Sequence, residues 1–115
     1  MSNIRVVVTG IGAVTPVGLD MPSTWDALIN GRSGVSTITR FDSSSLPVHV
    51  GAEVKNFDPL VAVDYKELRR TDYFEQYAIA AAREAKRNAN IEITPELSEE
   101  TGVGSAPPSG DYHRC

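Results

Sequence analysis

The sequence offers one thiol and two imidazoles, the side chains that most often act as nucleophiles and proton carriers. Cys115 is the last residue and His113 lies two positions before it, in a segment rich in Pro, Ser and Gly. Such a segment favours a disordered end with incidental residues over a catalytic pair. His49 alternates with valines and is interpreted as an exposed or partly packed strand residue. We therefore assign no catalytic role to any of the three.

A basic cluster is the second candidate for function. Lys66, Arg69 and Arg70 lie close together in a chain whose formal net charge is −4. Clustered cations can steer an acidic partner toward a surface, with an effect that salt weakens. The alternative is a solvated charged face, or pairing with Asp64 and Glu67, in which each exposed pair contributes only about 0.2–1 kcal/mol. The residues alone leave both interpretations open.

Two glycines after a valine run suggest a dinucleotide-binding turn, since Gly10 and Gly12 begin the pattern G-x-G-x-x-G. The third glycine position is occupied by Thr15, and Pro16 follows at once. The helix that would bind phosphate cannot begin there as the pattern requires. The glycines are interpreted as a structural turn, and no bound cofactor or metal is expected; a titration with NAD would test the nucleotide alternative.

Composition limits the class of protein. The chain has 115 residues, 41% hydrophobic and 23% charged, which is typical of one soluble globular domain. Diffuse negative charge argues against nucleic-acid binding, and no apolar run approaches the ~20 residues that span a bilayer. The N-terminus has neither a signal-peptide core nor an Arg-rich transit segment, and the single cysteine leaves no internal disulfide. We therefore predict a cytoplasmic protein without a membrane span.

The sequence predicts two strands. Residues 4–8 (Ile-Arg-Val-Val-Val) have no polar face, which favours a strand covered on both sides, as in a parallel sheet. Residues 48–54 alternate between apolar and other residues, which predicts a strand with one buried face.

Three helices are predicted, each with a recognisable cap. The caps are Asp20 for the first, Asp72 with Glu75 for the second, and Thr94 for the third. The first helix ends at Asn30-Gly31, and Trp25 shares a face with Leu28 and Ile29, so Trp25 is predicted to be core. The second helix has an apolar face that indicates close packing, made of Phe74, Tyr77, Ala78, Ala81 and Ala85. The order of the elements predicts an α/β fold.

The strings of residues along the chain resemble β-ketoacyl-[acyl-carrier-protein] synthases of the elongating, synthase II-like type. They are RVVVTGIGAVTPVG at 5–18, GRSG at 31–34, TRFD at 39–42, VKNFD at 54–58, KELRRTD at 66–72, and QYA at 76–78 with AAAREA at 80–85. The resemblance implies a thiolase-like (αβαβα) fold, of which residues 1–104 would form an incomplete N-terminal portion. Residues 105–115 do not follow the family pattern and are expected to be a divergent, disordered tail.

The resemblance also implies a function. Family members catalyse a decarboxylating Claisen condensation in fatty-acid elongation, using a cysteine and two histidines that lie beyond the positions matched here. We expect this chain alone to be inactive. Family substrates carry phosphopantetheine on acyl carrier protein. By the same resemblance, the docking of that carrier would involve Lys66, Arg69 and Arg70. Family members are homodimers. The alternative is a non-catalytic module that binds acyl carrier protein or a full-length synthase.

Overall fold

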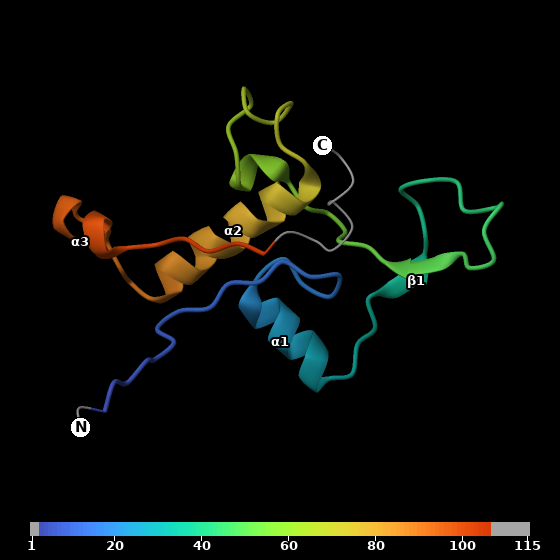
Figure 1. The fold of residues 1–115 in the computed structure, drawn as a ribbon. Coiled ribbons are helices and arrows are strands. Elements are labelled where there is room, and N and C mark those ends of the chain that lie inside the picture. The colour runs from blue at the N-terminus through green and yellow to red at the C-terminus, as the bar shows by residue number, and fades with distance from the viewer. Residues whose placement is uncertain (1–2, 107–115) are drawn as a thin grey trace.

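The computed structural model describes residues 3–106 and is organised around one long helix (Figure 1). In chain order the elements are α1 (Met21–Ile29), β1 (Val35–Thr37), β2 (Val50–Ala52), the 3-10 helix η1 (Pro59–Val61), α2 (Tyr73–Asn88) and α3 (Pro95–Glu100). Figure 1 shows α2 in the middle, with η1 on one side and α1 on the other, while the two strands and α3 lie at opposite ends. The segments that carry candidate residues are therefore positioned mainly by α2.

The three predicted helix starts are confirmed. Asp20 and Ser23 form a capping box at α1, in which the Asp20 carboxylate accepts from the Ser23 N–H at 2.8 Å. At α2 the Asp72 N–H donates to the Glu75 carboxylate at 2.8 Å, and at α3 the Thr94 hydroxyl accepts from the Leu97 N–H at 3.3 Å. These contacts span three residues, so the local sequence specifies them.

The predicted strand at residues 4–8 is absent. The segment runs away from α2 toward the N-terminus (Figure 1), and Val6, Val7 and Val8 are 91%, 70% and 80% exposed. A strand exists only where a neighbouring strand completes its hydrogen-bond ladder. Within residues 3–106 nothing pairs with this segment, so its strong β-propensity is not used.

The second predicted strand is confirmed only in part. It is shortened to β2, which pairs antiparallel with β1 so that Val35 lies opposite Ala52 and Thr37 opposite Val50. The expectation of a buried valine face is wrong, because Val50 is 54% exposed. Within residues 3–106 no helix packs on the two strands. The half-buried side of β2 is the one where Gly51 lies beside Ile38. The prediction also missed β1.

The buried apolar core of the described residues is small. It consists of Ala27, Ala62 and Val63. Trp25 is 58% exposed, so its predicted place in the core is wrong; Leu28 and Ile29 on the same face of α1 are exposed as well. The predicted apolar face of α2 is buried incompletely, since Tyr77 is half-buried while Phe74 remains 42% exposed.

The two glycines of the N-terminal loop let the backbone lie directly on α2. A Cβ at Gly12 would overlap the Ala81 carbonyl oxygen, and one at Gly10 would overlap the Ala85 carbonyl oxygen. Only glycine permits this approach. The glycines therefore have a packing role in this fold, in line with their interpretation as structural.

Candidate functional site

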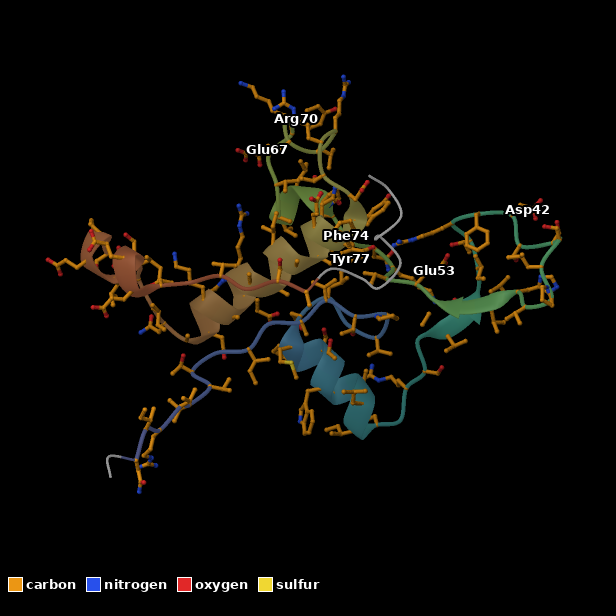
Figure 2. All side chains as sticks on the ribbon, viewed as in Figure 1. Asp42, Glu53, Glu67, Arg70, Phe74 and Tyr77 are labelled. Carbon is orange, nitrogen blue, oxygen red and sulfur yellow. The ribbon has the colours of Figure 1, made fainter. Side chains whose placement is uncertain are left out.

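The basic cluster lies on a turn that projects between η1 and α2. In Figure 2 Arg70 and Glu67 are at the tip of this turn, away from the body of α2. The turn is closed by backbone hydrogen bonds from Glu67 N–H to Asp64 C=O and from Arg70 N–H to Glu67 C=O, both 2.9 Å. Its root is fixed by the buried Ala62–Val63 pair. A short, well-bonded turn thus presents the cations to solvent.

The three cations of the cluster have no ionic partner in the part of the chain that the structure describes. Lys66, Arg69 and Arg70 are all exposed, and the ion pair recorded among residues 3–106 is a different one, Arg32 with Asp26. The pairing with Asp64 and Glu67 that the sequence left open is not formed. Three unpaired positive charges on one projecting turn can attract an anionic surface.

The base of this turn is tied to α2 by side-chain hydrogen bonds. The Arg83 guanidinium donates to the Val61 carbonyl at 2.9 Å, and the Gln76 amide donates to the Thr71 carbonyl at 3.2 Å. Gln76 is only 4% exposed. The position of the basic turn therefore depends on α2, although no charged side chain of α2 belongs to the cluster.

Arg40 forms a node that sequence reasoning missed. Its guanidinium donates to the Val54 carbonyl at 3.0 Å and to the Tyr77 hydroxyl at 2.5 Å, and it lies 4.7 Å from the centre of the Tyr73 ring. The hydrogen bond to Tyr77 is the main reason that the pKa of Arg40 is raised above its ordinary value. This node joins the strand hairpin to α2. Arg40 lies inside the family string TRFD, but its partners are far away in sequence and no local pattern indicates them.

Glu53 accepts hydrogen bonds from the backbone and side chains next to the Arg40 guanidinium contacts. Its carboxylate accepts from the Arg40 N–H at 3.0 Å and from the Thr39 hydroxyl at 2.9 Å. The hydrogen bond from the Arg40 backbone is the main cause that lowers the pKa of Glu53. Figure 2 shows Glu53 on the hairpin side and Tyr77 on the α2 side of this contact.

Glu84 is a second residue that the sequence analysis missed. One carboxylate oxygen accepts from the Ala13 N–H at 2.9 Å and the other from the Met21 N–H at 2.7 Å. One side chain of α2 thus holds both the N-terminal loop and the first turn of α1. No local sequence signal could have indicated this role, because the bonds join residues 71 and 63 positions apart.

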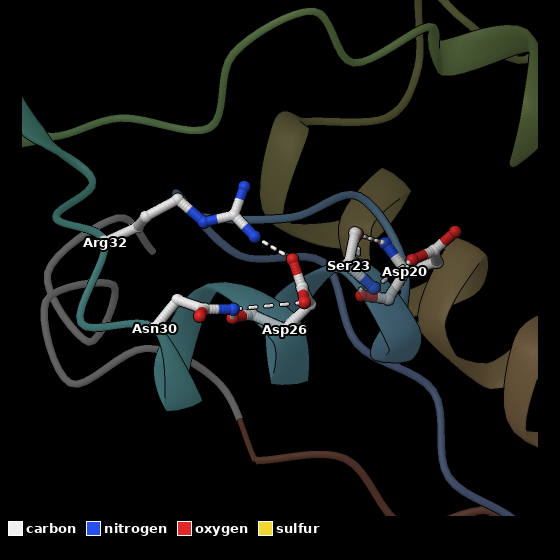
Figure 3. A network of polar contacts seen from close by, with 5 residues as sticks. All are labelled: Asp20, Ser23, Asp26, Asn30 and Arg32. Atoms are coloured by element: carbon white, nitrogen blue, oxygen red, sulfur yellow. Dashed lines mark hydrogen bonds and ion pairs between the residues drawn. The ribbon is translucent and has the colours of Figure 1, made fainter.

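A polar network runs along α1 (Figure 3). Asp26 bonds to the Asn30 amide at 3.1 Å and pairs with Arg32, while Asp20 and Ser23 cap the other end of the helix. The Ser23 hydrogen bonds lower the pKa of Asp20 below its ordinary value. These contacts stabilise the two ends of the helix.

Of the two imidazoles and the thiol, the His49 imidazole is the one that lies within the described residues. His49 Nδ1 lies 2.8 Å from the Ser43 carbonyl, and this contact orients the ring on the hairpin loop. His113 and Cys115 lie outside the residues that the structure describes. In residues 3–106 no group of three His, Cys, Asp or Glu side chains could hold a metal ion. None of the helices within that range is long and apolar enough to cross a membrane.

Comparison with known proteins identifies the class. The family model described as "Beta-ketoacyl synthase, N-terminal domain" matches residues 3–114. The chain therefore belongs to the β-ketoacyl synthase family. The match includes most of the segment 105–115 that the sequence sets apart, and the boundary after residue 104 stays a prediction.

Individual relatives narrow the comparison. The "3-oxoacyl-[acyl-carrier-protein] synthase 2" of Coxiella burnetii (strain RSA 493 / Nine Mile phase I) is 45% identical over 103 residues, which cover 90% of this chain and 25% of that protein. The protein of the same name from Staphylococcus aureus (strain MRSA252) is 46% identical over 101 residues, 88% of this chain and 24% of its own length. The chain thus spans about a quarter of the length of the curated relatives it matches.

A solved structure confirms the fold. "The ishigamide ketosynthase/chain length factor" superposes with a TM-score of 0.69 at 33% sequence identity, covering 76% of this chain and 22% of that one. The thiolase-like fold expected from the resemblance is therefore confirmed as that of a ketosynthase portion.

Proposed function

We propose that this chain supplies the N-terminal portion of a 3-oxoacyl-[acyl-carrier-protein] synthase, an acyltransferase of fatty-acid elongation. The observation that carries the proposal is its 45% identity to a synthase 2 over 90% of the chain. In the reaction, a cysteine thiolate accepts an acyl group, and malonyl-carrier protein loses carbon dioxide to give the carbanion that attacks the thioester. The reaction requires an activated thiolate and donors aimed at the developing oxyanion. Residues 3–106 contain no cysteine and one histidine bound to its own loop, so the chain alone is proposed to be inactive.

The role proposed for the basic turn is to dock acyl carrier protein. Lys66, Arg69 and Arg70 are exposed, project from the body and have no ionic partner among residues 3–106. An acidic protein surface that approaches this turn gains charge-assisted contacts without breaking any existing pair. The acyl group would arrive on the phosphopantetheine of that carrier. The homodimer and the cytoplasmic location expected from the resemblance and the composition remain predictions for this chain.

Carrier docking is tested by titrating the chain with acyl carrier protein at about 20 mM and 150 mM salt. Binding should weaken as salt rises, because the Debye length shortens to about 8 Å at the higher value. The double variant Lys66→Glu/Arg69→Glu should lose binding. Lys55→Glu/Lys86→Glu, which reverses the same number of charges elsewhere on the surface, should retain it. An equal loss in both double variants, or binding that salt does not change, would reject the docking role.

Catalysis is tested separately in a condensation assay with malonyl-carrier protein. The chain is expected to give no product above background, whereas a full-length synthase 2 from Staphylococcus aureus serves as the active control. Product formed by this chain would overturn the proposal that its chemistry lies in residues outside it. Carrier binding without product is the result expected of an N-terminal portion that docks the carrier but holds none of the reacting groups.

A further inference from the structure

The basic turn, which comprises residues 64–71, enters α2 through a polar contact beside the helix cap. In many helices an apolar residue just before the N-cap packs against the fourth helical residue, and this contact fixes the angle at which the chain enters the helix. The N-cap of α2 is Asp72, so these two positions are occupied by Thr71 and Gln76. The Gln76 Nε2 atom donates to the Thr71 hydroxyl and to the Thr71 carbonyl, each at 3.2 Å. A hydrogen-bonded pair therefore takes the place of the usual apolar one.

The link continues from Thr71 into the turn. The Thr71 hydroxyl donates to the Glu67 carbonyl at 3.1 Å, and the same carbonyl accepts from the Arg70 N–H at 2.9 Å. A hydroxyl can accept one hydrogen bond while it donates another, so this side chain connects the helix to the backbone of the turn. Figure 2 shows Glu67 and Arg70 at the tip, away from the body of α2. Consecutive hydrogen bonds thus run from Gln76 through Thr71 to the backbone of Arg70.

Gln76 is the fixed end of this link. The residue is 4% exposed and belongs to α2. Its side-chain oxygen is buried and has no hydrogen-bond partner among residues 3–106. A buried amide oxygen without a partner is unfavourable, and an apolar side chain of the same size would avoid that cost. The two N–H donors therefore explain the side chain better than filling of the core does.

The other end of the turn is held by different contacts. The Arg83 guanidinium donates to the Val61 carbonyl at 2.9 Å, and the next two residues, Ala62 and Val63, are buried. These contacts precede residue 64, so they fix the start of the turn and not the part that carries Arg70. The orientation of Arg70 relative to α2 depends instead on the link from Gln76 through Thr71.

We propose that Thr71 and Gln76 are positioning residues for carrier docking, which hold the basic turn so that Arg70 meets an acidic partner in a fixed orientation. The inference rests on the docking role proposed above for the basic turn. A surface that is already ordered loses less freedom when its partner binds, so it binds more tightly than a flexible surface with the same charges. The cations therefore supply the attraction, and the link supplies their orientation.

The test compares variants of the full chain in the titration with acyl carrier protein at about 20 mM salt. Thr71→Val keeps the shape of the side chain but removes the hydroxyl, and it should raise the dissociation constant about tenfold. Thr71→Ser keeps the hydroxyl and should bind within about twofold of the unmodified chain. The matched control is Thr101→Val, because the Thr101 hydroxyl also donates to the carbonyl four residues earlier, that of Leu97, at 2.5 Å. This control lies outside the turn and should leave the dissociation constant unchanged.

A second variant tests whether Gln76 acts through Thr71. Gln76→Met keeps the length of the side chain and removes both donors, so it should weaken carrier binding as much as Thr71→Val does. The double variant should bind no more weakly than either single variant, because both changes break the same link. Losses that multiply in the double variant would show that the two residues act separately, which would reject the link.

The same change in an Arg70→Ala chain distinguishes positioning from a general loss of structure. If the link acts by orienting Arg70, Thr71→Val should weaken carrier binding less than about threefold in that chain. A general loss of structure would weaken binding about tenfold in both chains. Amide hydrogen exchange gives a readout without carrier: the Arg70 N–H should exchange faster in Thr71→Val but not in Thr71→Ser, while the Ala89 N–H at the far end of α2 stays unchanged.

The outcomes separate this inference from docking itself. An unmodified chain that does not bind acyl carrier protein would overturn the docking role, and this inference with it. Salt-sensitive binding that requires Lys66 and Arg69 but is equal in Thr71→Val and Thr71→Ser would overturn the inference alone. An equal loss with and without Arg70, or a tenfold loss in Thr101→Val, would reject it as well.

Discussion

Glu84 shows how one side chain can position two separate segments. Its two carboxylate oxygens accept from Ala13 and Met21, so the loop and α1 meet α2 through a single group. Because Glu84 is half-buried and accepts from both neighbours, a change at this position leaves N–H groups without a partner. A substitution of Glu84 is therefore expected to destabilise the contact of both the N-terminal loop and α1 with α2.

We expect Glu84→Gln to loosen this attachment. The glutamine keeps one oxygen but turns an NH₂ group toward an N–H, so one hydrogen bond is lost, at a cost of about 1–3 kcal/mol. Amide hydrogen exchange at Ala13 or Met21, whichever loses its acceptor, should speed up by at least about fivefold. Glu92→Gln, at an exposed position without a side-chain hydrogen bond among residues 3–106, is the control. Unchanged exchange at both amides would contradict the role given to Glu84.

The Asp20 cap leads us to predict that α1 loses stability in acid. Hydrogen bonds from Ser23 hold the pKa of Asp20 below its ordinary 3.8 in the folded helix. A depressed folded pKa contributes stability that is present above about pH 3.8 and is lost as the pH falls through the lower folded value. Asp20→Asn keeps a good cap without a titrating group. The loss of helical circular dichroism between pH 5 and pH 2 should therefore be smaller in the asparagine variant, and equal losses would exclude this contribution.

Residues differ in how far the sequence predicts their roles. Asp20, Asp72 and Thr94 were predicted because a cap bonds to a residue three positions away. Arg40 and Glu84 were not, because their partners lie 37, 63 and 71 positions away and only the folded chain brings them together. The exposed basic cluster was predicted from charge alone, but its lack of an ionic partner required the structure.

At the scale of elements, the strand hairpin reaches α2 chiefly through Arg40. Phe57 packs edge-on against Tyr77 with ring centres 4.9 Å apart, and the Arg40 guanidinium lies over Tyr73. A planar guanidinium can donate to two acceptors while it lies over a ring, whereas an ammonium cannot reproduce that geometry. The hairpin should therefore depend on arginine itself and not only on a positive charge.

We predict that Arg40→Lys weakens the hairpin by about 0.5–1 kcal/mol, the usual size of an exposed cation–π contact. Hydrogen exchange at the Thr39 and Arg40 amides, which bond to Glu53, should accelerate about two- to fivefold. Tyr77→Phe removes only the hydroxyl, so the two changes together should cost less than their sum. Strict additivity would show that Arg40 and Tyr77 do not act as a pair.

The helices were easier to predict than the strands for a physical reason. A helix completes its hydrogen bonds within its own segment, so caps and periodicity suffice to place α1, α2 and α3. A strand depends on a neighbour that the local sequence does not name. Residues 4–8 have stronger β-propensity than residues 35–37, yet β1 forms and no strand forms at 4–8, because β1 has β2 beside it.

At the scale of the whole molecule, the chain is far from the compactness of an independent domain. Its radius of gyration is 17.6 Å, whereas about 13 Å is usual for 115 residues. Its accessible surface is 9827 Å², against about 6,100 Å² for a folded monomer of its 12.4 kDa mass. Many large apolar side chains are exposed, among them Val6, Trp25 and Val50. The relatives, of which the chain covers a quarter, contain much more polypeptide on which such side chains can pack.

This surface predicts how the chain will unfold. Among residues 3–106 the buried apolar side chains are Ala27, Ala62 and Val63, too few to offset the conformational entropy of a cooperative domain. We expect a broad heat transition of low amplitude and strong binding of a hydrophobic dye at 25 °C. The melt should be recorded for the unmodified chain at a low and a high concentration, so that any effect of self-association is seen, with intact synthase 2 of Staphylococcus aureus as a cooperative control. A single sharp transition that does not change with concentration, with an enthalpy near 0.7 kcal/mol per residue at about 60 °C, would show that these few contacts specify a stable domain and that the exposed valines do not destabilise it.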